Sequence, residues 1–516
     1  MVCSLTRTAA TEAAGRLDKS DAVKIGTLHS HAFRALGNPE MVEGNLDNWN
    51  STGSYPLSGS MDVDDPYTKT PGKTEGDEIN ERYHLLRARC ADRAGWPGDV
   101  LRFAKQYEAW KTENDLADFT DLISWAIDAP LPDPPSVIYA DECQDHSRLE
   151  LDLLRSWARQ AGRLVIVGDP WQSLYGWRGA YPAMFQSDKV PADRRHVLSQ
   201  SYRVPRAVHG AALRWVQRLS DYAPIEYAPR DADGVAELLH GADADNPAPL
   251  VDAALDQRRA GKTVMICASC SYMLRSVLAE LRSRGAPYAN PWRTKRGDWN
   301  PLTPGRGVST GRRVLAFLGP LLGEQREVFP FGANLEPRLW SITDLALWVD
   351  MLSGRQVLQP NAKTEILAAA KGASAVSQCV YSLTDWFNDD AIPFLDRMIR
   401  GEVDRTTAVD WLAKRLLSKY GNATQYPLRV LEKSGPEAIT EPPRLYVGTI
   451  HSFKGAEADV VYVLPDLSLS AIREWRFGDT DGIVRMFYVA MTRARESLYV
   501  CDMAGGMSVP VWESLN

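Results

Sequence analysis

Two short apolar runs, each followed by a polar cluster, constrain the fold of this chain more than any other feature. The first cluster lies in VIYADECQD at residues 137–145, and the second in LVIVGDPWQSLYGWRGA at residues 164–180. Val137–Ala140 and Leu164–Val167 have the length and composition of strands that are buried in the middle of a parallel sheet. The two runs therefore predict an α/β fold.

The segment between the two runs has the spacing of a helix, because Leu149, Leu153 and Trp157 recur every fourth residue. We therefore expect strand, helix and strand, with the two strands parallel in one sheet. Ligands of open α/β sheets bind at the carboxyl ends of the strands. Both polar clusters should thus face one site.

The polar residues at this edge suit phosphate chemistry. Asp141 and Glu142 follow the first run, and Gly168, Asp169 and Gln172 follow the second. One carboxylate can hold Mg²⁺, usually through water, and another can orient or deprotonate an attacking water. We assign Asp141 to the metal and Glu142 to the water, and we expect a nucleotide-driven motor. An isolated Asp-Glu pair after a strand is a weak signal, and the second cluster strengthens it.

Length and composition bound the remaining possibilities. A chain of 516 residues should fold as more than one domain, since single cores stop growing near roughly 250 to 300 residues. An apolar fraction of 44% and a charged fraction of 24% are typical of a soluble globular protein. The net charge of −7 argues against a wholly basic nucleic-acid coat, so any DNA contact must be a local patch.

Nothing in the sequence indicates a membrane or an oxidising compartment. No stretch has the ~18 apolar residues of a membrane helix, and the N-terminal residues lack a signal-peptide core. The seven cysteines have no framework spacing, so we expect free thiols and a cytoplasmic protein. Cys267 and Cys270 form a Cys-x-x-Cys pair, but no second pair completes a zinc site, and a structural role is favoured.

The pattern along the chain predicts two α/β lobes, each interrupted by an insertion. Residues 43–80 are poor in large apolar side chains, which predicts a mobile loop. A helical pattern follows from Glu81 to Ile127 and is interrupted near Trp96-Pro97-Gly98. A strand is expected at Val264–Ala268 and a helix from Tyr272 to Arg284. The expected bounds are 1–36 and 116–225 for the first lobe, 37–115 for its helical insertion, 226–290 and 441–516 for the second lobe, and 291–440 for a second, mainly helical insertion.

A short internal echo supports paired lobes. GTLHS at residues 26–30 recurs as GTIHS at residues 448–452, at the matching position of each predicted lobe. A hydroxyl and an imidazole at the start of a helix can contact a phosphate together with free backbone amides. A similarity of five residues can arise by chance, and the matched position makes chance less attractive.

The segments DECQD, GDPWQSLYGWRGA, QSYR, GTIHSFKGAEADVVYV and YVAMTRAR, in this order, resemble successive motifs of the UvrD/Rep/PcrA family of superfamily 1 DNA helicases. The resemblance runs from about residue 2 to residue 501. It implies two RecA-like parallel-sheet lobes with the P-loop NTPase fold, the first truncated at its N-terminus, each with a mainly helical insertion. It also implies ATP and Mg²⁺ as cofactors, 3′-to-5′ movement, and single-stranded DNA and single- to double-stranded junctions as substrates.

The resemblance also assigns roles at the nucleotide. Gln172 would sense the γ-phosphate, and Arg203 and Arg493 would stabilise the transferring phosphoryl group as arginine fingers. Tyr202 would stack near the base, and Glu457 would contact the ribose. As alternatives, either arginine could be a surface ion pair, with Arg495 the more expected bystander, and Glu457 could be a carboxylate at a helix start.

On the DNA side, Trp177 would offer a base-stacking platform contributing roughly 1 to 3 kcal/mol. Arg178 would support the adjacent phosphate or the acidic cluster. Thr27, His29, Thr449 and His451 would hold the DNA backbone, although either histidine could instead be a satisfied core residue. The stretch DFTDL at residues 118–122 resembles a family segment that we expect to be structural.

One family element is not recognisable. Family members begin with a strand and a P-loop, whereas VCSLTRTAA at residues 2–10 resembles the next motif, with Leu5 in place of a DNA-stacking aromatic. Pro71-Gly72-Lys73-Thr74 is rejected as a P-loop, because Tyr67 stands where a glycine is needed, no strand precedes it, and no helix-forming run is expected directly after it.

Three explanations for the unrecognised P-loop stay open: a separate chain carries it, the start codon was placed too late, or the chain no longer uses nucleotide. We expect an ATP-dependent helicase or translocase that takes the segment from elsewhere. The alternative is a nucleotide-incompetent, single-stranded DNA-binding or regulatory remnant.

Overall fold

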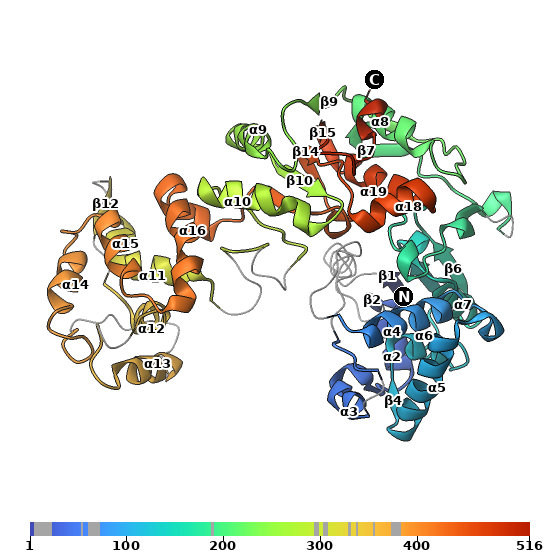
Figure 1. Cartoon of the computed structure of the whole chain (residues 1–516), viewed down its shortest axis with the longest axis horizontal. Helices are drawn as coiled ribbons and strands as arrows, with labels where there is room; N and C mark the ends of the chain where they lie inside the picture. Colours follow the sequence, from blue (N-terminus) through green and yellow to red (C-terminus); the bar gives the residue numbers. More distant parts are fainter. Residues whose placement is uncertain are drawn as a thin grey trace. The chain divides into compact units, whose positions relative to one another are not determined.

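The computed structural model describes residues 1–4, 23–52, 55–59, 73–186, 190–293, 299–302, 308–322, 324–328, 332–336, 339–353, 357–372 and 383–515. Contacts between residues divide the chain into two compact units (Figure 1). The first unit comprises Met1–Asp243, Cys267–Met273 and Thr449–Asn516, and the second comprises Ala244–Ile266 and Leu274–Gly448. All of the predicted site residues belong to the first unit. The expected boundaries of lobes and insertions differ from this division and stay a prediction.

The first sheet has four parallel strands in the order β2-β1-β5-β6. The strands are β1 (Val2–Ser4), β2 (Ile25–Thr27), β5 (Val137–Ala140) and β6 (Arg163–Ile166). Helix α7 (Arg148–Ala158) connects β5 to β6, so the predicted strand, helix and strand are confirmed, with the second strand one residue earlier than expected. Ile138, Leu153 and Trp157 are fully buried in the core between sheet and helix.

A group of helices gathers beside this sheet (Figure 1). They are α2 (Leu28–Ala35), α4 (Glu75–Ala88), α5 (Gly98–Glu113) and α6 (Phe119–Ala126). α4 and α5, with α3 (Leu46–Ser51), enclose a second, largely aromatic core that contains Trp49, Tyr83, Phe103, Tyr107 and Trp110, whereas α2 and α6 contribute to the core of the sheet. The break that the sequence predicts near Trp96-Pro97-Gly98 is confirmed, since Pro97 precedes the first residue of α5.

The mobile loop expected over residues 43–80 is wrong where the structure describes it. A 3₁₀ turn at Val42–Gly44 and helix α3 (Leu46–Ser51) lie inside this range, and α4 begins at Glu75. The Trp49 side chain connects helix α3 to Tyr55, because it is buried and donates its indole N–H to the Tyr55 carbonyl at 2.7 Å. Residues 53–54 and 60–72 lie outside the described residues.

The stretch at residues 71–74, which we rejected as a P-loop, also differs from expectation, because α4 follows it directly. Thr74 caps this helix, accepting from the amide of Asp77 at 3.0 Å, and Lys73 pairs with Glu81 at 2.6 Å. Pro71 and Gly72 lie outside the described residues. Lys73 and Thr74 thus lie at the start of a helix. The expectation that no helix follows this stretch directly is wrong.

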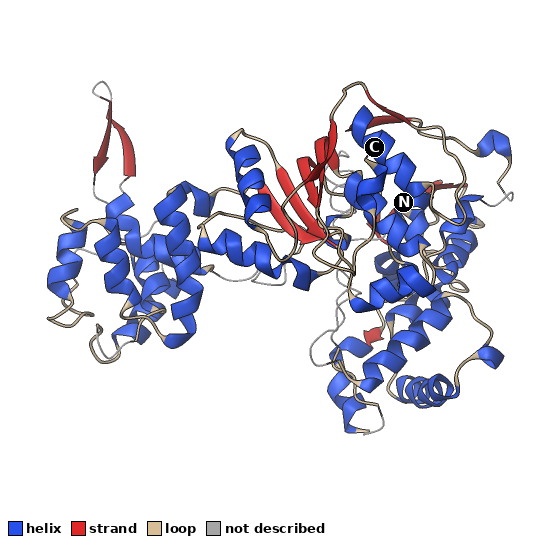
Figure 2. Cartoon of the chain, turned by 45° about the horizontal axis from the view of Figure 1, so that its top comes forward, coloured by secondary structure: helices blue, strands red, loops and turns tan. Residues whose placement is uncertain are grey.

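The second sheet has five strands in the order β13-β10-β14-β15-β9, and they lie side by side in Figure 2. The strands are β9 (Val235–Leu239), β10 (Val264–Ala268), β13 (Leu445–Thr449), β14 (Ala458–Val463) and β15 (Ala494–Cys501). β15 pairs in parallel with both β14 and β9. The strand expected at Val264–Ala268 is confirmed, and the helix expected from Tyr272 begins as a 3₁₀ turn (Ser271–Leu274) before α10 (Arg275–Ser283). Both sheets agree with the predicted α/β class.

Further elements of the first unit complete the frame around the site. They are β3 (Glu40–Met41), β4 (Leu116–Ala117), β7 (Gln200–Pro205), β8 (Ala228–Arg230), α8 (Arg206–Val216), α18 (Leu469–Phe477), α19 (Asp481–Met491), and the 3₁₀ turns η3 (Cys143–Asp145), η4 (Pro170–Gln172), η5 (Gly176–Arg178) and η10 (His451–Phe453). The strand pairs β3–β4 and β7–β8 are parallel.

The second unit is mainly helical where it is described. Besides α9 (Ala248–Arg259) and α10, its helices are α11 (Thr310–Leu322), α12 (Ile342–Val349), α13 (Ala362–Gly372), α14 (Ile392–Ile399), α15 (Arg405–Ala413), α16 (Ser418–Ser434) and α17 (Glu437–Thr440). An antiparallel hairpin of β11 (Glu324–Val328) and β12 (Gly332–Glu336) was not expected there. Throughout the described part of the chain, no helix is both long and apolar enough to cross a bilayer.

Candidate functional site

The acidic loop after β5 contains a strained residue. Glu142 has φ 54° and ψ 37°, the left-handed conformation that side chains other than glycine rarely adopt. Hydrogen bonds on both sides enforce it: the Glu142 amide donates to Asp141 Oδ1 at 2.9 Å, and the Cys143 amide donates to the Val167 carbonyl at 2.9 Å. Strain of this kind costs on the order of 1–3 kcal/mol and clusters at functional sites.

The two carboxylates of the predicted acidic pair have different environments. Burial and the neighbouring Glu142 charge raise the pKa of Asp141. Burial also disfavours the Glu142 charge, but Lys454, Gln144 and Arg493 outweigh it and hold the pKa of Glu142 below its ordinary value. Glu142 is therefore a stably ionised acceptor, whereas Asp141 carries a repulsion that a bound cation would relieve.

The donor set at Asp141 fits Mg²⁺ in the form that phosphate-transfer enzymes use. Mg²⁺ prefers oxygen ligands and keeps several waters, so one or two carboxylates plus phosphate oxygens suffice. Among the described residues, no group of three or more His, Cys, Asp or Glu side chains is placed to hold a metal by itself. Asp141 would thus hold Mg²⁺ together with a phosphate rather than alone.

A chain of polar contacts leads from Glu142 to the second cluster. The Gln144 side chain donates to Glu142 Oε2, and its Oε1 accepts from the Asp169 amide at 3.2 Å. Asp169 Oδ2 in turn accepts from Gln172 Nε2 at 2.6 Å. Gly168 allows this approach, because a Cβ there would lie 2.2 Å from Gln144 Oε1. The two polar clusters therefore meet, as the sequence predicts.

Arg493 completes this chain from the C-terminal part of the first unit. Its Nη2 donates to Gln172 Oε1 at 2.7 Å, while its Nε donates to the Val489 carbonyl at 3.0 Å. The residue is 2% exposed, and burial together with the Arg203 charge lowers its pKa to about 10. The guanidinium is thus held rigidly beside the Gln172 amide, and the surface-ion-pair alternative for Arg493 is wrong.

Lys454 also reaches the acidic loop, and nothing in the sequence predicted a role for it. Its ammonium lies 3.4 Å from Glu142 Oε2, contacts Asp145 Oδ2, and donates to the Gln172 carbonyl at 3.2 Å. Asp145 is fully buried and accepts the Leu174 amide at 2.9 Å through its other oxygen. Lys454 therefore ties the acidic loop to η4.

Arg203 forms a partly exposed ion pair in this structure, which was the alternative to its role as an arginine finger. Its Nε donates to Glu457 Oε2 at 2.8 Å, and Arg495 Nη1 donates to Glu457 Oε1 at 2.8 Å. Arg495 is thus a second partner of Glu457. Glu457 lies in the turn before β14, so the alternative that it starts a helix is wrong. Beside this bridge, Tyr202 is 86% exposed, as a side chain free to stack on a ligand would be.

The two echo segments have the same local hydrogen bonds. Thr27 Oγ1 accepts from the Ser30 amide at 3.1 Å, and Ser30 Oγ donates to the Thr27 carbonyl at 2.8 Å. Thr449 Oγ1 accepts from the Ser452 amide at 3.3 Å, and Ser452 Oγ donates to the Thr449 carbonyl at 2.7 Å. The sequence echo is therefore a structural one, although α2 follows the first copy and only η10 follows the second.

The residues predicted to touch DNA differ in exposure. His29 is partly exposed and lies 3.8 Å from Glu150, and its ring packs edge-on against Phe119. Trp177 and Arg178 in η5 are half-buried around Tyr175, which Arg178 covers at 5.7 Å. Thr449 is 0% and His451 3% exposed, so a DNA contact through these two side chains would require them to become exposed.

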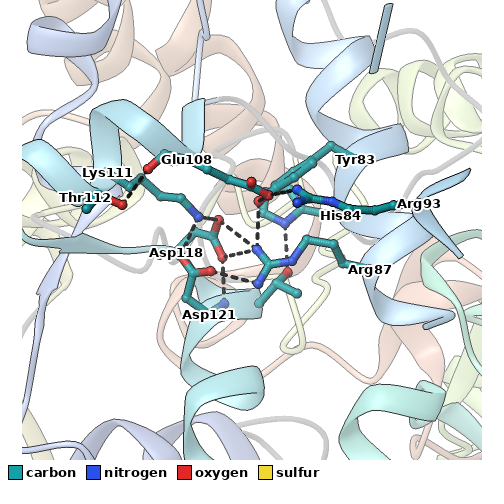
Figure 3. A network of polar contacts seen from close by, with 10 residues as sticks. Tyr83, His84, Arg87, Arg93, Glu108, Lys111, Thr112, Asp118 and Asp121 are labelled. Carbon is teal, nitrogen blue, oxygen red and sulfur yellow. Dashed lines mark hydrogen bonds and ion pairs between the residues drawn. The ribbon is translucent and has the colours of Figure 1, made fainter. Parts of the chain in front are cut away.

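The DFTDL segment forms a buried charge network (Figure 3). Lys111 from α5 contacts the carboxylates of both Asp118 and Asp121, and Arg87 from α4 donates to Asp121 at 2.8 Å. The His84 ring meets Thr120 Oγ1 at 2.7 Å. Asp118 and Asp121 also cap α6. Two cations against two anions clamp three helices, which agrees with the structural role that the sequence predicts.

Four residues of this site received no role from the sequence: Gln144, Asp145, Asp169 and Lys454. Three of them lie inside the quoted polar clusters, so their position after a strand was an available signal. Lys454 follows the second echo segment and has no local partner to indicate its role. Its contact with Asp145 spans more than three hundred residues, which no spacing rule anticipates.

Comparison with known proteins agrees with this geometry. Residues 96–192 match the model of the UvrD/REP helicase N-terminal domain, and residues 444–501 match that of the UvrD-like helicase C-terminal domain. The first match contains the acidic loop and η4, and the second contains Lys454, Glu457 and Arg493. The groups that meet at the site thus come from both matched regions.

Three curated relatives show how far the similarity extends. The chain is 22% identical over 456 residues to a putative ATP-dependent DNA helicase, YjcD, of Bacillus subtilis, covering 78% of this chain and 58% of that protein. It is 30% identical over 137 residues to the ATP-dependent DNA helicase PcrA of Staphylococcus epidermidis, covering 24% and 19%. It is 30% identical over 130 residues to the ATP-dependent DNA helicase PcrA of Staphylococcus aureus, covering 23% and 18%. Each match spans less than two thirds of the relative.

Proposed function

The chain belongs to the UvrD/PcrA-like helicases, and on that premise we propose that it is a superfamily 1 DNA helicase or translocase that couples ATP hydrolysis to 3′-to-5′ movement on single-stranded DNA. The observation that carries the proposal is the continuous polar chain from Glu142 through Gln144, Asp169 and Gln172 to Arg493. A γ-phosphate placed against this chain would meet a base, an amide and a guanidinium. Those are the groups that phosphoryl transfer requires.

Each group has a distinct task in the proposed reaction. Glu142 accepts a proton from, or orients, the attacking water, and its low pKa keeps it ionised. Gln172 contacts the γ-phosphate through its amide, and Arg493 stabilises the charge that spreads over the phosphoryl oxygens. Mg²⁺, held by Asp141 when bound, supplies neutralisation of the phosphate charge. Tyr202 would stack near the base, and Glu457 would contact the ribose.

Arg203 needs a rearrangement to serve as the second arginine finger, because in this structure it is bound to Glu457. A ribose hydroxyl that takes over the Glu457 carboxylate would release Arg203 toward the phosphates. Under this proposal, the bridge Arg203–Glu457–Arg495 is a resting arrangement of the site.

The described part of the site offers no glycine-rich loop to enclose the β-phosphate. We propose that the chain takes this loop from elsewhere, for example from a separate chain. DNA would lie along His29, Trp177 and Arg178, with Thr27 at the start of α2 and with Thr449 and His451 on the second echo segment.

The test measures phosphate release by two proteins, the chain as it stands and the chain extended by the codons directly upstream, each with and without single-stranded DNA. In the protein that hydrolyses ATP, DNA should raise turnover and Glu142→Gln should lower it by at least about 100-fold, the contribution of a general base. Glu513→Gln, which removes an exposed partner of Arg218, is the matched control. Absence of hydrolysis from both proteins, with DNA binding retained, would rule out an upstream segment as the source of the loop and would leave a separate chain or the non-hydrolysing alternative.

A further inference from the structure

The turn that carries Gln172 is held from its opposite end by one arginine. Arg485 of α19 donates from Nε to the Pro170 carbonyl at 3.2 Å. Its Nη2 donates to both carboxylate oxygens of Asp221, at 2.7 and 2.9 Å. Arg485 is 8% exposed, whereas the Asp221 side chain is 33% exposed. Hydrogen bonds between a guanidinium and a carboxylate are stronger and more directional than those between neutral groups, and here the same arginine also satisfies a main-chain oxygen of η4.

The middle residue of η4 is held by aromatic packing. Trp171 stacks on Tyr222, with ring centroids 5.6 Å apart and an interplanar angle of 17°, and meets Tyr488 of α19 edge-on at 5.7 Å. Trp171 is buried and its amide is bound by Asp169 Oδ1 at 2.9 Å. Pro170, Trp171 and Gln172 are thus each fixed by a separate contact.

Asp221 and Tyr222 belong to a segment that α19 also fixes. Asp481, the first residue of α19, accepts from both the amide and the hydroxyl of Ser220, at 2.9 and 2.8 Å. Residues 220–222, which follow α8 closely, therefore lie between the start of α19 and η4. This segment has no motif in the sequence, and the catalytic groups described above do not include it.

Helix α19 links these contacts to the reacting end of the site. Arg485 and Tyr488 lie in α19, and Arg493 follows the last residue of this helix, Met491, and donates to the Val489 carbonyl at 3.0 Å. One helix therefore positions both the main chain of η4 and the guanidinium that binds the Gln172 side chain. Displacement of η4 by even one ångström would break the 2.7 Å contact between Arg493 and Gln172, since a hydrogen bond is not made at 3.6 Å.

We propose that Arg485 and Asp221 are positioning residues, which hold η4 against α19 so that the Gln172 amide meets Arg493. The inference rests on the proposed function for its catalytic meaning, but its structural content does not. Segment 220–222 would then transmit any displacement of α8 to the γ-phosphate side of the site through Asp221 and Tyr222. Neither residue touches the reacting atoms, so both act through Gln172.

The test is amide hydrogen exchange of the nucleotide-free chain, followed by mass spectrometry of peptides that cover residues 168–176. Arg485→Gln and Asp221→Asn should each accelerate exchange in this peptide on the order of 10-fold and leave peptides from β5 and α5 unchanged, because local opening involves few contacts. Arg485→Lys, which can keep the Asp221 pair but not the Pro170 contact as well, should fall between. Arg218→Gln is the control, since it removes an ion pair with Glu513 at the end of α8.

Two outcomes would overturn the proposal. Unchanged exchange over residues 168–176 in both variants would show that η4 does not depend on the pair. An equal acceleration in all peptides would show that the pair only stabilises the fold. If Arg485→Gln does not fold, Asp221→Asn and Arg485→Lys give the same decision.

A second readout connects the pair to catalysis. Arg485→Gln should lower DNA-stimulated turnover as much as Gln172→Ala does, and the double variant should be no worse than either single variant. Additive losses would overturn the claim that Arg485 acts through Gln172. Because the exchange experiment needs no ATP, an inactive protein would count against the proposed function and leave the positioning claim to be decided by exchange.

Discussion

The ammonium of Lys454 lies 3.4 Å from a carboxylate oxygen of Glu142, and the two residues come from the two regions that match helicase domain models. Lys454 is 9% exposed and also contacts the fully buried Asp145. Lys454 and Asp145 are therefore both buried, whereas the Glu142 side chain is 33% exposed. Removing the cation leaves two carboxylates without their counter-ion.

We expect Lys454→Met to lower the free energy of unfolding by about 3 to 5 kcal/mol, the cost of leaving a buried charge unpaired. Lys454→Arg should cost less because it keeps the charge. The measurement is urea denaturation followed by circular dichroism. Lys24→Met, which removes a pair with the exposed Asp133, is the control and should cost less than about 1 kcal/mol. Equal effects of the two methionine variants would contradict the account.

Glu150 should make part of the stability depend on pH. Burial opposes its charge, but His146, His29, Arg178 and the Ser147 amide outweigh burial and lower its pKa to about 2. In the unfolded chain the pKa returns to an ordinary value near 4.3. The contribution of Glu150 is thus complete above the unfolded pKa and is lost as the pH falls toward 2.

Glu150→Gln should therefore weaken the pH dependence of stability between about pH 5 and pH 3 by about 1.5 kcal/mol, which is roughly half of the ~3 kcal/mol that the whole pKa difference represents. Glutamine can keep the capping box with Ser147, so the helix start is preserved. The measurement is thermal unfolding at several pH values. Parallel curves for the variant and the unchanged protein would show that Glu150 titrates normally.

The network in Figure 3 predicts a stability effect without a direct effect on ligand binding. Lys111→Met leaves Asp118 and Asp121 with Arg87 alone, so we expect a loss of about 3 to 5 kcal/mol. Arg93→Gln, which removes an exposed pair with Glu108, should change stability by less than about 1 kcal/mol. The comparison is made by thermal unfolding, and similar midpoints for the two variants would disprove a structural role for the network.

Replacement of Tyr202 should weaken nucleotide binding and leave the stability of the fold unchanged. Its ring is 86% exposed, so Tyr202→Ala should change the free energy of unfolding by less than about 0.5 kcal/mol. A stacked aromatic contributes roughly 0.5 to 1.5 kcal/mol, so the KM for ATP should rise roughly 2- to 10-fold. Tyr202→Phe should keep the KM. An unchanged KM in the alanine variant would remove Tyr202 from the nucleotide site.

The sequence predicted the frame of the site because its signals are local. An apolar run such as Val137–Ala140 determines its own strand, and chain direction then brings Asp141 and Gln172 to one edge. The family resemblance assigned Gln172 and Arg493 to the same phosphate, and the two side chains do meet, but their roles at the nucleotide stay a prediction. The echo segments were correctly paired because the threonine and the serine make the same short-range bonds in each.

Most of the contacts that the sequence did not predict join residues far apart in the chain. The others lie in the range 43–80, which has few large apolar side chains. Lys454 and Arg203 bind carboxylates that lie far away in the sequence. The residues around Arg203 do not indicate that its partner is Glu457 rather than another glutamate such as Glu142. The loop expected over residues 43–80 was wrong because three of the few large apolar side chains of this range, Trp49, Leu57 and Ile79, are buried in one core. Backbone strain at Glu142 is likewise invisible in the sequence.

The central claim, that Arg493 stabilises a phosphoryl group beside Glu142, is tested most directly by steady-state ATP hydrolysis at saturating single-stranded DNA. Arg493→Lys should lower kcat by about 10³-fold or more, with KM changed far less and DNA affinity preserved, since an arginine finger acts mainly in the transition state. A kcat within about twofold of the unchanged protein, a difference below 1 kcal/mol, would contradict the account.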